Sequence, residues 1–438
     1  MKKLTITGGT PLNGTIRLGG AKNASFKIMI ATLLAPGESR ILNFSHIADV
    51  ELTKDILTSL GCKIREAGER TLYIDTQNLN KFEIAEKFGK KSRASTMFIG
   101  PLLARFCKAA VPLPGGDKIG RRPLERHFEG LIALGAKVQI KNSHALVTCK
   151  NLKATKFTFA KKTHTGTETM IMAAVLAQGT TVLENAALEP EVDDLIKFLN
   201  RMGAQIKRET KDSIVISGVR KLKPSIHQLM PDRNEAVTYA CAAIATRGDI
   251  IVENARPKDM QAFLDKLKLV GGGYEIGKYG VRFYYKQPLT AAKVITRPHP
   301  GFMTDWQPLW TVLMTQAKGE SIVHEAVFTS RFQYVKDLNR MGADIKLFDP
   351  QVKNRENFYN FNPDDDKGDH LHSAKITGIT PLKAGDFKVT DIRAGATLVL
   401  AALIAKGKTT ITDTDHIDRG YENLPGRLRQ LGAKIEQM

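Results

Sequence analysis

The feature that most constrains the fold is a unit that occurs six times. Each copy has an apolar, helix-like stretch, a glycine, and then a strand-like run such as Ala-Lys-Ile. Glycine suits the end of a helix because it adopts the left-handed conformation without a steric penalty. The copies lie roughly 70 residues apart, and only the last interval is about 20 residues longer, which predicts a repeat architecture. The glycines are Gly61, Gly135, Gly203, Gly271, Gly342 and Gly432.

A second signature alternates with the first: a mostly alanine-rich apolar helix, a glycine turn and a run with high strand propensity. It is found at residues 31–37, 173–179, 242–248, 312–319 and 401–407, with a degenerate copy at 102–108. Each unit is therefore expected to hold two helices and several strands. A chain of 438 residues is too long for one ordinary core. Three units per domain match the usual domain size and place the crossing near Met230.

The long last interval indicates an insertion within residues 346–372. Asp349-Pro, Asn362-Pro and the acidic run from Asp364 supply turn and loop chemistry there. The sequence predicts a solvated surface loop, and a functional loop is the alternative.

Composition narrows the class of protein. The longest apolar runs are less than half of the ~20 residues that a membrane-spanning helix needs, and no apolar signal core follows Met1-Lys-Lys. We expect a cytoplasmic protein without a membrane partner. The four cysteines have neither Cys-x-x-Cys spacing nor a nearby histidine at metal-ligand spacing, so they are expected to be reduced core residues, with no metal site or disulfide framework.

The formal net charge of +20 favours anionic partners. Nucleic acid is the obvious candidate. However, the basic residues are spread along the whole chain, aromatic residues make up only 7%, and no binding signature is found. Direct nucleic-acid binding is therefore disfavoured, and the charge leaves the kind of anionic partner open.

The stretch Gly19-Gly-Ala-Lys22-Asn23-Ala lies between a strand-like run and an apolar helix that begins at Phe26. Free backbone amides and the helix dipole favour an anion at such a helix N-terminus, and a lysine adds a full charge. This stretch resembles the opening motif of the UDP-N-acetylglucosamine enolpyruvyl transferase family. Further matches follow in the family's order over nearly the whole chain: Arg93-Ala-Ser, Gly100-Pro-Leu-Leu-Ala-Arg-Phe, Leu113-Pro-Gly-Gly-Asp117-Lys-Ile-Gly-Arg-Arg122-Pro, Glu184 to Glu191, Pro231-Asp-Arg, Thr304-Asp305, Arg331-Phe, Thr390-Asp-Ile-Arg393-Ala and His416 to Tyr421.

The resemblance implies a fold and a domain arrangement. The fold is an α/β (α+β) two-domain inside-out α/β barrel, with three βαβαββ repeats per domain around buried helices. Residues 22–232 would form the first domain, and residues 1–21 plus 233–438 the second. The repeat count gives the same grouping independently, and a cleft between two domains is the default place for an active site.

The resemblance also implies a reaction: transfer of the enolpyruvyl group of phosphoenolpyruvate to the 3-hydroxyl of UDP-N-acetylglucosamine, with release of phosphate. This is the first committed step of peptidoglycan precursor synthesis. The two substrates are the expected partners, no cofactor is needed, and a monomer or weak homo-oligomer is expected.

The loop from Pro114 to Gly120 surrounds Asp117 with three glycines and a proline, a composition typical of a mobile lid or of a simple surface turn. The resemblance makes this loop catalytic, although many family members have cysteine at the position of Asp117. A carboxylic acid in a closed site can have a raised pKa and donate a proton. Because a carboxylate is a far poorer nucleophile than a thiolate, we expect insensitivity to fosfomycin, which alkylates the cysteine.

Asp305 follows the turn at Pro300-Gly301 and precedes a helix, so it is either a helix cap or a functional acid. The resemblance assigns it contact with the sugar 3-hydroxyl, and we expect it to be the general base, with Asp117 or Lys22 as the acid toward C3. Arginines can bind phosphate and carboxylate groups bidentately. The resemblance assigns phosphoenolpyruvate to Lys22, Asn23, Arg122, Arg331, Arg393 and Arg419.

The sugar nucleotide is assigned by resemblance to Asn23, Arg93, the run Arg122, Pro123, Leu124, Glu125 and Arg126, the segment Lys162, Thr163, His164, Thr165 and Gly166, Asp305 and the backbone of Val327. The family usually has serine and valine in the segment that reads Thr163-His164-Thr165 here. His164 is therefore either a nucleotide contact or a solvated loop residue. Glu189 and Asp232 are expected to support the cationic site without acting chemically.

Two rival functions stay open. The first is 5-enolpyruvylshikimate-3-phosphate synthase, which shares the architecture but is disfavoured because it has a Lys-Ser motif where this chain has Lys22-Asn23. The second is a nucleic-acid or regulatory binding protein that kept the fold and lost the activity, as the charge of +20 would allow.

Overall fold

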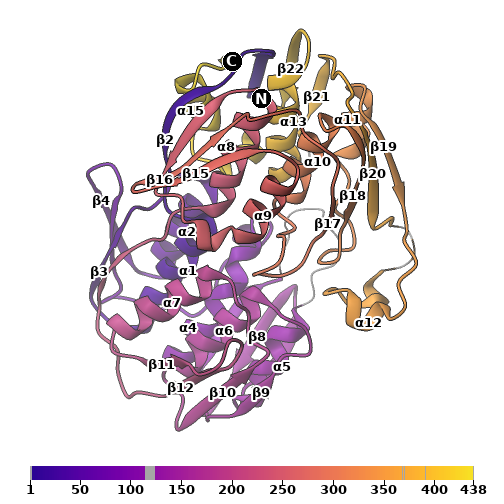
Figure 1. Ribbon diagram of the computed structural model, residues 1–438. Coiled ribbons are helices and arrows are strands. Elements are labelled where there is room, and N and C mark those ends of the chain that lie inside the picture. Colours follow the sequence, from indigo (N-terminus) through magenta and orange to yellow (C-terminus); the bar gives the residue numbers. More distant parts are fainter. Residues whose placement is uncertain (1, 114–123, 367, 369, 390, 438) are drawn as a thin grey trace. The chain divides into compact units, whose positions relative to one another are not determined.

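The structure is a computed structural model that describes residues 2–113, 124–366, 368, 370–389 and 391–437 (Figure 1). Backbone contacts divide it into two compact units. One unit holds residues 19–113 and 124–230, and the other holds residues 2–18 and the described residues from 231 onward. Each unit has its own hydrophobic core. The expected functional cleft between two domains stays a prediction.

The unit of residues 19–230 contains three copies of the predicted α/β repeat. Its helices are α1 (Lys22–Ala31), η1 (Thr32–Leu34), α2 (Ala48–Ser59), α3 (Glu86–Gly89), η2 (Arg93–Phe98), α4 (Ile99–Phe106), α5 (Glu125–Ala133), α6 (His164–Ala174) and α7 (Pro190–Arg201). Its strands are β3 (Glu38–Leu42), β4 (Lys63–Ala67), β5 (Thr71–Asp75), β6 (Lys108–Pro112), β7 (Lys137–Lys141), β8 (His144–Thr148), β9 (Lys156–Thr158), β10 (Thr180–Glu184), β11 (Gln205–Arg208), β12 (Ile214–Ser217) and β13 (Ile226–Gln228).

The other unit contains the remaining three copies. Its helices are α8 (Arg233–Ala245), η3 (Pro257–Asp259), α9 (Gln261–Leu269), α10 (Gln307–Thr315), α11 (Val335–Arg340), α12 (Arg355–Phe358), η4 (Pro363–Asp365), α13 (Ile392–Ile404), α14 (Asp415–Asp418) and α15 (Leu424–Gln430). Its strands are β1 (Lys3–Thr7), β2 (Asn13–Arg17), β14 (Asp249–Glu253), β15 (Gly273–Gly277), β16 (Gly280–Tyr284), β17 (Lys293–Ile295), β18 (Gly319–His324), β19 (Asp344–Phe348), β20 (Ser373–Gly378), β21 (Asp386–Lys388), β22 (Lys408–Thr412) and β23 (Lys434–Gln437).

The strands of the described residues form six sheets, one for each predicted repeat. Their strand orders are β13-β3-β5-β4, β6-β8-β7 and β11-β12-β10-β9 in the first unit, and β15-β16-β14-β2, β17-β18-β20-β19 and β21-β22-β1-β23 in the second. Each four-stranded sheet has one parallel pair and two antiparallel pairs. In the three-stranded sheet, a parallel bridge between Glu83 and Ala110 lies where the fourth strand would pair.

The six glycines that end the repeated helices have left-handed φ values between 92° and 103°. The predicted helix end is therefore confirmed at every copy, since L-residues with a side chain rarely adopt this conformation. The apolar helices α6, α8, α10 and α13 of the second signature are buried along nearly their whole length, as is α1 from Ala24 to Ala31. Their interior position explains why these helices are apolar on all sides.

The expectation of a solvated loop at residues 346–372 is wrong in part. The excursion between β19 and β20 forms α12 and η4, and Tyr359 and Phe361 pack into a small core with Ala326. Tyr359 has 1% of its surface exposed. In Figure 1, α12 lies beneath the sheet that contains β18, β19 and β20. Aromatic side chains bury enough apolar surface to order a segment whose backbone carries many turn residues.

Candidate active site

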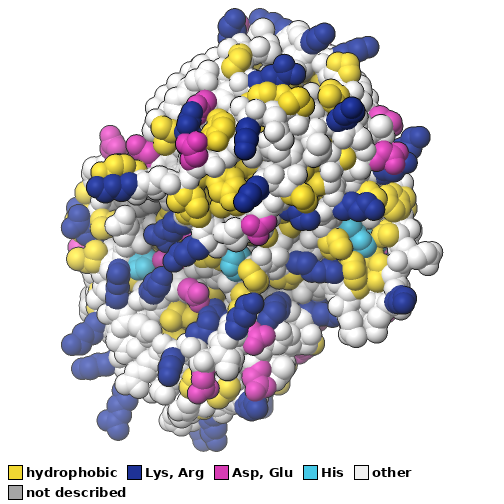
Figure 2. Space-filling view, viewed as in Figure 1, with side chains coloured by type: hydrophobic (Ala, Val, Ile, Leu, Met, Phe, Trp, Pro, Cys, Tyr) yellow, Lys and Arg dark blue, Asp and Glu magenta, His cyan; other side chains and the backbone are white. Residues whose placement is uncertain are grey.

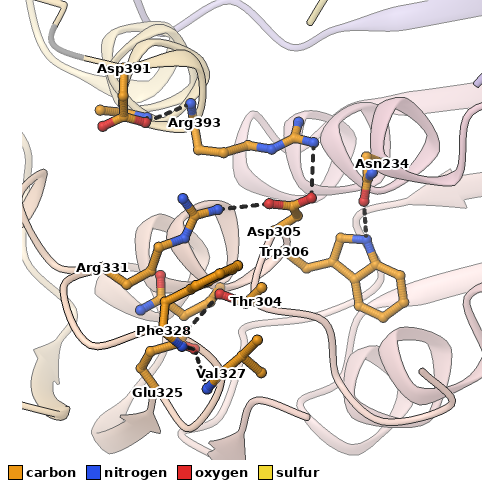
Figure 3. Close-up of polar contacts among 12 residues, drawn as sticks. Asn234, Thr304, Asp305, Trp306, Glu325, Val327, Phe328, Arg331, Asp391 and Arg393 are labelled. Carbon is orange, nitrogen blue, oxygen red and sulfur yellow. Dashed lines mark hydrogen bonds and ion pairs between the residues drawn. The ribbon is translucent and has the colours of Figure 1, made fainter. Parts of the chain in front are cut away.

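The carboxylate of Asp305 has an arginine on each of its two oxygens (Figure 3). Arg331 Nη2 donates to Oδ1 over 2.7 Å, and Arg393 Nη2 donates to Oδ2 over 3.3 Å. The Asp305 side chain is 22% exposed, whereas that of Arg331 is only 5% exposed. Charge-assisted pairs of this kind are strong, and here one partly exposed anion lies between two buried cations.

Arg393 is held in place by the start of α13. The carboxylate of Asp391 accepts the backbone N–H groups of Arg393 and Ala394 and so caps the helix. Arg393 Nη1 donates to the Tyr421 hydroxyl over 2.9 Å. Burial alone would lower the pKa of Arg393, but Asp305, Tyr421 and Asp232 together outweigh burial and raise it. Arg393 therefore stays a fixed positive charge beside Asp305.

Asp305 does not cap α10, which was the alternative left open by the sequence. The helix begins at Gln307 after Trp306, and no described side chain caps its N-terminus. The Trp306 indole instead donates to Asn234 Oδ1 over 2.9 Å, which fixes the residue that follows Asp305. Packing of Trp306 and the ion pairs of Asp305 thus orient this turn.

The turn that contains Val327 is organised by a buried carboxylate. Glu325 Oε1 accepts the backbone N–H groups of Val327 and Phe328 over 2.8 and 3.0 Å, and Oε2 accepts the Thr304 hydroxyl. Burial raises the pKa of Glu325, although Arg331 and these hydrogen bonds oppose the rise. Glu325 therefore ties the Val327 turn to the residue that precedes Asp305. Glu325 lies in none of the sequence motifs that resemble the family's.

The expected site residues are distributed over both units. Asp305, Val327, Arg331, Arg393 and Arg419 lie in the unit that includes residues 231–437, and Arg419 directly follows α14. Asp117, Arg122 and Pro123 lie outside the described residues. The other predicted substrate-binding residues and Glu189 lie in the unit of residues 19–230, whereas Asp232 lies in the unit that includes residues 231–437.

Lys22 is the first residue of α1 and Asn23 the second, so the motif lies at the helix N-terminus as expected, but the helix begins four residues before the predicted start at Phe26. Lys22 Nζ lies 3.0 Å from Asp49 Oδ2, and the Lys22 side chain is 15% exposed. Gly20 brings the chain into this position, because a Cβ there would lie 2.1 Å from the carbonyl oxygen of Asn43. Close backbone approach explains why the motif begins with glycine.

The segment of residues 162–166 leads into α6 and is held from several directions. Thr163 caps the helix by accepting the Gly166 N–H group, and Lys162 Nζ pairs with Asp212 Oδ2 over 3.1 Å. The Thr165 hydroxyl lies 2.9 Å from His127 Nε2. His127 follows Leu124, Glu125 and Arg126 at the start of α5. The contact between His127 and Thr165 joins the start of α5 to the 162–166 segment, and both regions are expected to bind the sugar nucleotide.

His127 is 2% exposed and has a strongly shifted pKa. Burial, together with the positive charges of Arg93 and Arg126, lowers the pKa of His127 to about 3. The positive charges of both arginines therefore act on the imidazole that contacts Thr165 of the 162–166 segment. His127 was missed because a single histidine on a helix gives no sequence signal of its own.

His164 is not a solvated loop residue, which was one of its two expected roles. Its side chain is 21% exposed, and Nε2 lies 2.8 Å from Lys27 Nζ and 3.2 Å from Glu168 Oε1. Lys27 and Glu168 were also missed. A lysine and a glutamate inside otherwise apolar helices were the signal that could have found them.

Among the described residues, no group of three or more His, Cys, Asp or Glu side chains could hold a metal ion. In the same part of the chain, no helix is long and apolar enough to cross a membrane.

All four cysteines are free thiols. Cys62 and Cys241 are buried as expected, whereas Cys107 and Cys149 are only half-buried. Figure 2 shows Lys and Arg side chains scattered over the visible face, in line with the dispersed sequence pattern.

Comparisons with known proteins agree with this geometry. The family model described as EPSP synthase (3-phosphoshikimate 1-carboxyvinyltransferase) matches residues 6–428. Proteins named UDP-N-acetylglucosamine 1-carboxyvinyltransferase are similar over the full length: one from Desulforapulum autotrophicum is 39% identical, with 100% of each chain covered, and one from Sorangium cellulosum is 41% identical, with 99% of this chain and 98% of the relative covered.

Two solved structures share the fold. The enolpyruvyl transferase NikO from Streptomyces tendae superposes with a TM-score of 0.85 at 23% identity, covering 100% of this chain and 99% of the other. EPSP synthase from Acinetobacter baumannii superposes with a TM-score of 0.74 at 18% identity, with 100% of both chains covered. The predicted inside-out α/β fold is thereby confirmed. The chain is a transferase and belongs to the enolpyruvyl transferase family that includes the UDP-N-acetylglucosamine 1-carboxyvinyltransferases.

Proposed function

We propose that this enzyme transfers the enolpyruvyl group of phosphoenolpyruvate to the 3-hydroxyl of UDP-N-acetylglucosamine and releases phosphate, the first committed step of peptidoglycan precursor synthesis. Relatives with that name at 39–41% identity over nearly the whole chain support the substrates. The observation that carries the proposal is the partly exposed Asp305 carboxylate between two buried arginines. It offers a proton acceptor next to cations that fit an anionic substrate.

Asp305 is the general base of this mechanism. The sugar 3-hydroxyl gives its proton to the carboxylate while its oxygen forms a bond to C2 of phosphoenolpyruvate, and C3 takes up a proton. The resulting tetrahedral intermediate loses a proton from C3 and its C2–phosphate bond breaks, which yields the enolpyruvyl ether and inorganic phosphate. Electrostatic stabilisation of the anionic intermediate is the largest expected contribution.

Arg331 and Arg393 change partners during binding. Without substrate, the two guanidinium groups stabilise the charged form of the Asp305 carboxylate and make it a weak base. The carboxylate and phosphate of phosphoenolpyruvate compete for the same guanidinium groups, together with Lys22, Asn23, Arg122 and Arg419. As the arginines turn toward the substrate, Asp305 loses stabilisation of its charge and becomes a stronger base.

The proton for C3 comes from Asp117 or Lys22. Lys22 lies at the N-terminus of α1, where the helix dipole also favours an anion. In the described residues, the Lys22 ammonium pairs with Asp49, which holds it near that helix end. Asp117 carries the acid role by resemblance. Because Asp117 replaces a thiol, we infer that the enzyme is insensitive to fosfomycin, and a time-dependent irreversible loss of activity with this compound would contradict that inference.

The sugar nucleotide binds through Asn23, Arg93, the run 122–126, the segment 162–166 and Val327. The support is the action of the Arg93 and Arg126 charges on His127, which contacts the 162–166 segment, and the Glu325-braced turn of Val327. Both substrates carry charged phosphates that do not cross a lipid bilayer unaided, so the reaction is expected in the cytoplasm.

Phosphate release from phosphoenolpyruvate tests the proposal. We expect release only when UDP-N-acetylglucosamine is added. Release with shikimate 3-phosphate instead would assign the activity by which the matching family model is described. No release with either acceptor, together with salt-dependent binding of a polynucleotide, would favour a binding protein that kept the fold.

A further inference from the structure

Three ionisable side chains meet where α1 packs beside the start of α6: Lys27 of α1, which is distant in the sequence, and His164 and Glu168 of α6, which are one helical turn apart. The Lys27 and Glu168 side chains are 2% and 0% exposed, and Lys27 Nζ lies 2.8 Å from His164 Nε2 and 2.6 Å from Glu168 Oε2. Burying two charges is costly, and their mutual attraction offsets that cost only partly. Because the buried Lys27–Glu168 pair contributes little net stability, we looked for a role of the pair in positioning His164.

The contacts determine which nitrogen of His164 carries the proton. Lys27 has only N–H donors, and its contact with Nε2 has hydrogen-bond geometry, so Nε2 accepts. The Glu168 carboxylate lies 3.2 Å from Nε2 but is not aligned for a hydrogen bond, so the ring does not donate toward it. A neutral imidazole with Nε2 as acceptor has its hydrogen on Nδ1.

The Nδ1–H group is available to a ligand. His164 Nδ1 has no hydrogen-bond partner among the described residues, and it is not one of their buried unpaired polar atoms. The neighbouring residues are fixed, because Thr163 caps α6 and Thr165 contacts His127. The segment therefore presents one oriented N–H donor to its accessible side.

We propose that Lys27 and Glu168 are positioning residues that hold His164 as the Nδ1–H tautomer, so that this N–H donates to an acceptor oxygen of the nucleotide part of the substrate. The inference rests on the proposed function, which supplies a nucleotide at the 162–166 segment. The acceptor is either a carbonyl oxygen of the base or an oxygen of the diphosphate. A donor fixed in advance improves affinity because less freedom is lost on binding.

The tautomer itself is tested without substrate or turnover. Histidine nitrogens in protein labelled with 15N-histidine have different chemical shifts when protonated and unprotonated, and the signals of His164 are those missing from His164→Asn. We expect protonated Nδ1 and unprotonated Nε2 in the free enzyme. A protonated Nε2 would overturn the proposal.

The positioning role is tested with Lys27→Met/Glu168→Met, which replaces the buried pair by unbranched apolar side chains of similar volume. We expect this variant to fold and its His164 ring to sample both tautomers. If the variant retains the pure Nδ1–H tautomer, Lys27 and Glu168 do not set it.

Two substitutions at His164 separate the inward contact from the outward donor. His164→Asn places an amide near the position of Nδ1, whereas His164→Gln places one near that of Nε2. We expect His164→Gln to weaken UDP-N-acetylglucosamine binding by about tenfold or more, as measured by calorimetry and KM, with little change in kcat. His164→Asn is expected to retain most of the affinity. Equal affinity loss in both, or none in either, would contradict the donor role.

The source of the acceptor oxygen follows from ligand fragments. If the donor faces the base, His164→Gln weakens uridine and UDP binding by the same factor; if it faces the diphosphate, only UDP binding is weakened. Failure of the proposed function has a different signature, since the wild-type enzyme would then not bind UDP-N-acetylglucosamine at all, while the tautomer measurement would be unaffected.

Discussion

Asp305 and Glu168 are carboxylates with two basic partners each, but their surroundings differ. Asp305 lies between Arg331 and Arg393 with 22% of its side chain exposed, whereas Glu168 lies beside Lys27 and His164 with none exposed. A partly exposed carboxylate can exchange its partners for a substrate. A fully buried one cannot do so without leaving a charge uncompensated. The same kind of cluster is therefore suited to chemistry in one unit and to positioning in the other.

The largest effect is expected from Asp305→Asn, which removes the proton acceptor and keeps the shape. General-base catalysis is worth about 100- to 10,000-fold, so kcat should fall by that factor in steady-state assays. The free energy of unfolding should also fall, because two buried arginines lose their counter-ion, but by less than for a fully buried pair, since water reaches the partly exposed Asp305 side chain. Retention of at least a tenth of the wild-type kcat would remove Asp305 from the role of base.

Glu168→Gln should have the opposite profile. It leaves the Lys27 ammonium buried without a compensating charge, and such a loss costs about 3–5 kcal/mol of unfolding free energy in denaturant titrations. Activity of the remaining folded enzyme should fall far less than in Asp305→Asn. Lys27→Met/Glu168→Met is the matched control and should recover most of the stability. If Glu168→Gln is as stable as the wild type, the two carboxylates do not differ in the way described.

Acid should lower the free energy of unfolding through a third buried group, His127, which lies in the same unit as Glu168. Burial lowers its pKa in the folded enzyme to about 3, below the ~6.5 of an unfolded chain. The stabilising contribution is fully present above pH ~6.5 and is lost as pH falls toward 3, by up to ~1.4 kcal/mol per pH unit. Urea titrations at several pH values should show a shallower loss for His127→Gln. An unchanged slope would contradict this prediction.

The smallest effect is expected in the 346–372 insertion. Tyr359→Phe removes the contact between the Tyr359 hydroxyl and His324 Nε2 at 3.1 Å but retains the aromatic packing. A single hydrogen bond contributes about 1 kcal/mol, so thermal unfolding should shift only slightly and kcat should be unaltered. A loss of several kcal/mol would mean that the insertion is part of the main core rather than a local cluster.

The fold could be predicted from the sequence because each repeat ends a helix on a glycine that must be left-handed, and all six have that conformation. Asp305, Arg331 and Arg393 could also be predicted, since each lies in a motif that resembles the family's, whereas Glu325 lies in none. Lys27, Glu168 and His127 could not be predicted, because their contacts join helices distant in sequence and no local pattern records such a pairing. The insertion was misjudged because turn residues dominate its sequence while a few aromatic side chains order it.

Direct detection of the reaction product is the most direct test of the central claim, that Asp305 serves as base in enolpyruvyl transfer to UDP-N-acetylglucosamine. Mass spectrometry after incubation with phosphoenolpyruvate should detect UDP-N-acetylglucosamine carrying one carboxyvinyl group with the wild-type enzyme, at a rate reduced by about 100-fold or more with Asp305→Asn. No such product from the wild type, or equal rates from both proteins, would contradict the account.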